Sequence, residues 1–82
     1  MPTIAWIGAL RVVIYPNDHR PAHVHVIGNG CEAVFELHDA GEAVRLRENY
    51  RFKRKEIARI KKALMKILPA LWTAWKDIHG IE

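Results

Sequence analysis

The spacing of apolar residues changes once along the 82-residue chain, near residue 53, and this change limits the fold more than any other feature. Before it, β-branched and aromatic residues form short runs separated by turn-forming residues, a pattern typical of strands. After it, apolar residues recur at steps of three and four, as in an amphipathic helix. The sequence therefore predicts a small sheet followed by helices that cover it.

Five short strands are expected, each ended by residues that favour turns. The strongest turn signal is Gly-Asn-Gly at 28–30, which predicts a tight hairpin. Asp-Ala-Gly at 39–41 predicts the next turn, which leads to an edge strand whose Arg45 and Arg47 face solvent. The expected strands are 3–7, 10–15, 23–27, 32–37 and 42–47.

The helical part is expected to be broken once. Pro69 has no backbone N–H, so the apolar stripe must kink or restart near Leu68, and Gly80 is suited to end it. Residues 1–82 are too few for two independent cores. We therefore predict a single α+β domain in which a β-meander of four to five strands, at about 3–47, is packed on one face by a kinked or broken helix pair at about 53–79.

Composition excludes several classes of protein. Half of the residues are hydrophobic, 27% are charged and the mean hydropathy is −0.12, as in a packed soluble chain. The single Cys31 allows no internal disulfide. The sequence shows no export signal and no apolar run of membrane-spanning length. We expect a cytoplasmic protein without a membrane partner.

The 28–30 turn also predicts which residues of the hairpin face each other. A two-residue turn pairs His23 with Glu36 and His25 with Val34. A one-residue slip would exchange the two faces of the hairpin, so the assignment holds or fails as a unit. Val24, Val26, Ala33, Phe35 and Leu37 are then expected beneath the helices, and His23, His25, Glu32 and Glu36 on the opposite, exposed face.

Three histidines and one aspartate lie within residues 18–25. Imidazole is suited to proton transfer near neutral pH. The catalytic hypothesis makes His23 and His25 the general acid and base on a phosphodiester, with His19 orienting the substrate or stabilising charge, and with Glu36 tuning His23. If the protein is an enzyme, it is then a metal-independent ribonuclease that uses no cofactor.

Two other interpretations of the histidines remain open. Imidazole also binds borderline metals, so His23 and His25 form a weaker candidate metal site. Their spacing is not a standard zinc signature, and Cys31 is not expected on the same face. The histidines could also serve only structure and solubility, or hydrogen-bond to a partner.

Positive charge is concentrated in the second part of the chain, where residues 51–82 carry a net +6 and residues 1–50 a net −2. Four of these cations follow an i, i+4, i+7, i+11 series and so share one helix face, called here the basic ridge: Lys55, Arg59, Lys62 and Lys66. Like charges at i, i+4 repel each other, which favours a compensating partner. Together with Arg20, the ridge predicts a surface for nucleic acid or an acidic protein, although solvated basic faces are also common.

Several of these features together resemble the domain-of-unknown-function 4160 family over nearly the whole chain. They are the Met-Pro-Thr-Ile start, the Asp-His-x-Pro-x-His-x-His-Val block at 18–26, the hairpin with Glu36, and the closing amphipathic helices with their Trp. The matching block positions are Asp18, His19, Pro21, His23 and His25. The resemblance implies a toxin component of a toxin–antitoxin pair, whose partner is a small protein encoded nearby.

The functional expectation combines the resemblance with the charge pattern. We expect a toxin–antitoxin type component that binds a cognate small protein encoded nearby, and RNA or DNA through the basic ridge. One alternative is a non-enzymatic adaptor or regulator that uses the basic helix face, and another is a metal-binding module built on the histidine cluster. Association into a homodimer is left open.

Overall fold

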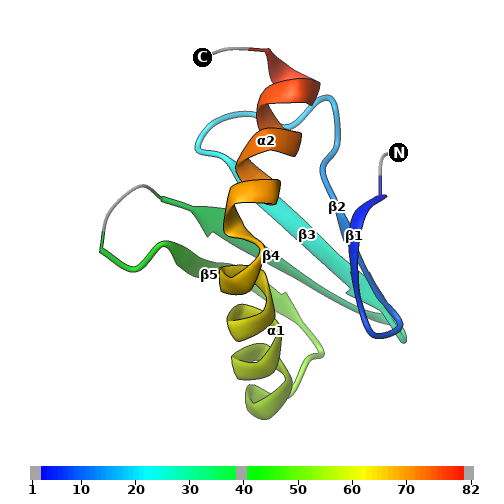
Figure 1. Ribbon diagram of the computed structural model, residues 1–82. Helices are drawn as coiled ribbons and strands as arrows, with labels where there is room; N and C mark the ends of the chain where they lie inside the picture. The colour runs from blue at the N-terminus through cyan, green and yellow to red at the C-terminus, as the bar shows by residue number, and fades with distance from the viewer. Residues whose placement is uncertain (1–2, 39–40, 81–82) are drawn as a thin grey trace.

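The computed structural model describes residues 3–38 and 41–80, and within them five strands are followed by two helices (Figure 1). Neighbouring strands pair antiparallel in chain order, which confirms the predicted meander and the α+β class. Met1 and Pro2, and Asp39 and Ala40 of the predicted 39–41 turn, lie outside the described residues, as do Ile81 and Glu82. The elements are β1 (Thr3–Ile7), β2 (Leu10–Val13), β3 (His23–Gly28), β4 (Cys31–Leu37), β5 (Val44–Tyr50), α1 (Arg54–Lys66) and α2 (Leu68–His79).

The β3–β4 hairpin has the predicted register, with His23 opposite Glu36 and His25 opposite Val34. Asn29 and Gly30 have φ values of 53° and 75°, the positive angles that a tight hairpin turn requires at both central residues. The five apolar residues predicted beneath the helices are all at most 2% exposed. The turn therefore sets the two faces of the hairpin as expected.

Several strand boundaries differ from the sequence-based prediction by one to three residues, and β5 starts at Val44 rather than at residue 42. β2 ends at Val13 rather than at residue 15, because the chain turns between Tyr15 and Asp18. β5 continues to Tyr50 rather than ending at residue 47, because a register shift lets it pair with β4 as far as Glu32. Arg45 and Arg47 are exposed on this edge strand, as predicted.

The helices follow one another nearly end to end along one face of the sheet (Figure 1). α1 ends at Lys66 and α2 begins at Leu68 with Pro69 in its first turn, which confirms the predicted break. Each helix buries two residues in the shared core, namely Ile60 and Leu64 from α1 and Leu71 and Trp75 from α2. Neither helix combines the length and hydropathy needed to cross a bilayer.

An exposed ion pair connects α1 to the segment before β5. Lys61 Nζ donates a hydrogen bond to the carboxylate of Glu42. This hydrogen bond, and then the charge of Lys61, lower the pKa of Glu42 below its ordinary value. Because the pKa is lower in the folded chain, the pair stabilises the fold above the ordinary pKa of Glu42, and this contribution is lost as the pH falls through the lowered value.

We expect Lys61→Gln to raise the pKa of Glu42 toward that of an unpaired glutamate, because the two largest causes of the lowering are removed and only the weaker effect of the Arg45 charge remains. The measurement is an NMR titration of the Glu42 side chain in the two proteins. Lys62→Gln, one position along the same helix, removes an equal charge and serves as the control. An unchanged Glu42 titration in Lys61→Gln would show that the pair does not persist in solution.

Candidate functional site

Three polar side chains converge where the β2–β3 loop meets the start of β3. The Asp18 Oδ2 atom lies 3.4 Å from His23 Nε2 and 3.3 Å from His25 Nε2. These side chains are only 14%, 8% and 15% exposed, respectively. The three residues, called here the Asp18 cluster, form the most concentrated set of titratable groups within the described residues.

A short turn places Asp18 over β3. The Asp18 N–H donates to the Tyr15 carbonyl at 3.0 Å, and the Tyr15 N–H donates to Asp18 Oδ2 at 3.1 Å. Such reciprocal bonds are typical of aspartate in turns, where the carboxylate holds its own backbone. This turn thus fixes the carboxylate that faces both imidazoles.

The tautomers of both imidazoles follow from their outer hydrogen bonds. His23 Nδ1 lies 2.8 Å from the Pro21 carbonyl oxygen, and His25 Nδ1 lies 3.2 Å from Glu32 Oε2. Carbonyl and carboxylate oxygens are acceptors, so Nδ1 is the donor in each ring. In the neutral form of each ring, the Nε2 lone pair is then directed toward Asp18.

Packing fixes the positions of the two rings. Tyr15 meets His25 edge-on at a centroid distance of 4.7 Å, and Trp75 of α2 lies 5.6 Å from the His23 ring. Val13, which faces His25 across β2 and β3, is fully buried. These contacts leave little freedom for either imidazole, so the cluster is preorganised.

The expectation that both histidines lie exposed on the open face of the sheet is wrong. His23 is 6% exposed and His25 is half-buried. The physical reason is that the loop folds back over the ring edges and that Trp75 covers His23, neither of which the strand pattern encodes. The backbone register was predicted correctly, but the surroundings of the side chains were not.

Glu36 and His19 do not join the cluster. Glu36 faces His23 across the strands, yet its carboxylate accepts a hydrogen bond from His38 Nε2 at 2.9 Å and lies 3.8 Å from Arg47 Nε. The β4 carboxylate that contacts the cluster is that of Glu32, which lies 3.2 Å from His25 Nδ1. The predicted register contained this signal, since Glu32 lies on the same face as His25 and diagonally across from it.

His19 is exposed and lies beside the cluster rather than within it. Together with two cluster residues it lines a depression of about 220 Å³. A path from solvent to the edge of the cluster therefore exists. The lining residues are Asn17, Asp18, His19, Arg20, His23 and Arg47.

The geometry does not favour the acid–base hypothesis. In each imidazole, Nδ1 is held by its own acceptor, so only Nε2 remains for proton transfer. Both Nε2 atoms face the same carboxylate, whereas a general acid and a general base need to reach opposite sides of a reacting phosphate. The arrangement is better suited to holding one cation between the three side chains.

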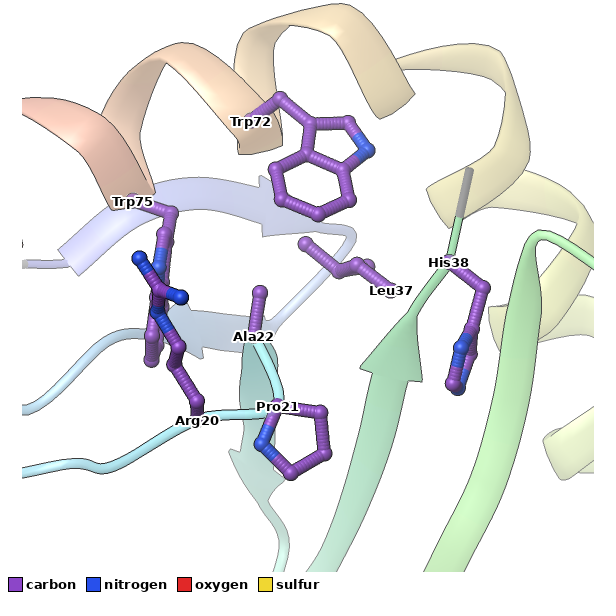
Figure 2. A pocket seen from close by; sticks show the side chains of 7 residues that line it. All are labelled: Arg20, Pro21, Ala22, Leu37, His38, Trp72 and Trp75. Atoms are coloured by element: carbon purple, nitrogen blue, oxygen red, sulfur yellow. The ribbon is translucent and has the colours of Figure 1, made fainter. Parts of the chain in front are cut away.

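Arg20 lies beside α2, where it lines a second depression, of about 250 Å³, together with Trp72 and Trp75 (Figure 2). The arginine and Trp75 side chains stand on one side of this depression, and His38 points away from them on the other (Figure 2). The sequence grouped Arg20 with the basic ridge, but the structure places it next to the Asp18 cluster instead.

The basic ridge is exposed on α1, as its spacing predicted. All four of its side chains are exposed, and no ion pair reaches any of them within residues 3–38 and 41–80. α1 lies at one end of the molecule, whereas the loop that carries Asp18 lies beside α2 at the other (Figure 1). The structure therefore does not bring the ridge and the histidines into one site.

Comparison with known proteins identifies the family of this chain. Neither the curated proteins nor the solved structures include a chain that matches this one. A family model described as Domain of unknown function (DUF4160) matches residues 10–76, which include the Asp18 cluster, the hairpin, all of α1 and most of α2. Since this match covers far more than half of the sequence, the chain belongs to the DUF4160 family.

Proposed function

We propose that this protein is the nucleic-acid-binding component of a toxin–antitoxin type pair, and that its basic ridge contacts the phosphate backbone of RNA or DNA. The observation that carries the proposal is the ridge itself, four exposed cations in a line without an acidic partner among the described residues. The pairing with a small protein encoded nearby follows from the family resemblance.

The geometry of the ridge supports a linear, anionic ligand. From Lys55 to Lys66 the helix rises about 16 Å, and the side chains of the series share one face opposite the buried Ile60 and Leu64. The only acid of α1, Glu56, is bonded to the backbone N–H of Lys53. A row of phosphates is expected to bind such a row of cations favourably. The contact relieves the repulsion between the cations and releases counterions from the nucleic acid.

The test is a nucleic-acid binding series in increasing salt with short single-stranded RNA and duplex DNA. For four phosphate contacts, log K is expected to fall linearly with log salt with a slope of about −3 to −4. Arg59→Gln/Lys62→Gln is expected to reduce the magnitude of this slope by about 2, since each contact contributes about 1. The measurement is fluorescence anisotropy of labelled oligonucleotides.

A matched control removes the same charge elsewhere. Arg45 and Lys76 are also exposed but lie on β5 and α2, so Arg45→Gln/Lys76→Gln is expected to leave the slope unchanged. Equal losses in the two double variants would reject the ridge as the contact surface. A flat salt response would reject nucleic acid as the ligand, and co-purification with the small protein encoded nearby would then identify an acidic protein as the partner of the ridge.

A further inference from the structure

We infer that the Asp18 cluster is a binding site for a divalent transition metal of the zinc class. Asp18, His23 and His25 each bring one donor atom within 4.8 Å of the other two. The inference goes beyond the proposed function, since it concerns the end of the molecule away from the ridge. It rests on hydrogen bonding, on the donor distances and on the chemistry of the donor set.

The hydrogen bonds leave acceptors facing one another inside the cluster. With Nδ1 as the donor in both rings, two imidazole lone pairs and the Asp18 carboxylate oxygen point toward a common space. The Tyr15 N–H donates a hydrogen bond to this oxygen from outside the common space. His25 Nε2 is buried and has no hydrogen-bond partner among the described residues. Buried acceptors without donors are costly, and a cation between them removes that cost.

The outer hydrogen bonds are those of metal-binding histidines. A ligating imidazole commonly donates its other ring N–H to a backbone carbonyl or a carboxylate, which fixes the tautomer and the direction of the lone pair. His23 makes the first kind of bond, to Pro21, and His25 makes the second, to Glu32. Both rings are therefore oriented before any metal binds.

The donor distances fit a tetrahedral ion. Ligands at about 2.0–2.1 Å from zinc stand about 3.3–3.4 Å apart in a tetrahedron. The two distances that involve Asp18 are 3.4 and 3.3 Å. The third distance, between the donor nitrogens of the two imidazoles, is within 4.8 Å.

The donor set selects the kind of metal. Two imidazole nitrogens and one carboxylate oxygen suit zinc, cobalt, nickel or iron, whereas calcium and magnesium prefer oxygen ligands alone. Three protein ligands leave the fourth position to water, as in catalytic rather than structural zinc sites. Asp18 and His23 also line the depression that reaches solvent beside His19, so water could approach the cluster from that side.

The experiment uses the untagged full chain, stripped of metal with EDTA and titrated with Zn²⁺ by calorimetry and with Co²⁺ by visible absorption. We expect one equivalent of Zn²⁺ to bind and Co²⁺ to give the intense bands of a four-coordinate site. Glu32→Gln, which weakens only the outer bond to His25, is expected to reduce the affinity about 10- to 100-fold. Asp18→Asn and His25→Gln remove ligands and are expected to reduce it further.

The controls separate loss of the site from loss of the fold. His38→Gln removes an imidazole that also has a carboxylate partner but lies outside the cluster, and it is expected to leave the affinity unchanged. Far-UV circular dichroism of each metal-free variant checks that the chain is folded, and Asn at position 18 can still accept the Tyr15 N–H. Absence of stoichiometric binding of Zn²⁺ and Co²⁺ to the wild-type chain would overturn the inference. Unchanged affinity in folded Asp18→Asn and His25→Gln would overturn it as well.

Discussion

Replacing Phe35 with alanine is expected to lower the free energy of unfolding by about 3–5 kcal/mol, the range for removing a buried aromatic ring from a packed core. Phe35 is fully buried and is the largest of the fully buried side chains. It lies on β4, an interior strand that pairs with β3 and β5, among the strand and helix residues of the core. Its ring therefore supports both layers at once.

The size of this loss is large relative to the whole stability. A domain of 82 residues is stable by about 4–12 kcal/mol, at about 0.05–0.15 kcal/mol per residue. A substantial fraction of the Phe35→Ala molecules is thus expected to be unfolded at room temperature. The measurement is urea denaturation followed by circular dichroism.

Leu46 provides the control, because it is the cross-strand neighbour of Phe35 on β5 but is 43% exposed. Leu46→Ala is expected to cost well under half as much, since less apolar surface is returned to water. Phe35→Leu, which keeps most of the buried volume, is expected to remain folded and allows the loss to be measured if the alanine variant is too unstable. Equal losses in Phe35→Ala and Leu46→Ala would contradict the placement of the core.

The fold could be predicted from the sequence because local chemistry determines its decisive features. Asn29 and Gly30 accept positive φ values at little cost, so the turn fixes the hairpin register and, through it, which residues are buried. Pro69 cannot continue a helix that started at residue 54, so the break was also readable. Both signals act within a few residues of their effect.

The Asp18 cluster could be predicted only in part, because its geometry depends on a loop. The sequence grouped Asp18 with the histidines, but nothing in the pattern says that the segment after β2 folds back to bring the carboxylate over both rings. The choice of Glu32 over Glu36 likewise depends on side-chain directions. The Glu36 carboxylate instead contacts His38, which follows β4, and Arg47 of β5.

The end of β5 shows the same division between local and long-range causes. Its start was predicted at residue 42 and lies at Val44, within two residues, whereas its extension to Tyr50 depends on a register shift between Val34 and Phe35. A shift of this kind is a property of the strand pair and has no signal in either strand alone.

Trp75 connects the core to the Asp18 cluster, and Trp75→Ala is expected to cost about 3–5 kcal/mol of the free energy of unfolding. The side chain is 5% exposed, its ring stacks on His79 at 3.8 Å, and it covers the His23 ring at 5.6 Å. Its removal takes away the ring contact between α2 and His23 at the start of β3. The variant is therefore expected to lose both stability and the burial of His23.

Trp6 and a conservative substitution test this interpretation. Trp6 is 62% exposed on β1, so Trp6→Ala is expected to change the free energy of unfolding by no more than about 0.5 kcal/mol, as for most surface positions. Trp75→Phe keeps an aromatic ring over His23 and is expected to retain more of the stability than Trp75→Ala. Denaturant unfolding followed by circular dichroism measures all three variants. Equal losses of free energy of unfolding in Trp6→Ala and Trp75→Ala would show that α2 does not pack on the sheet through Trp75. The burial of His23 under this side chain would then be contradicted as well.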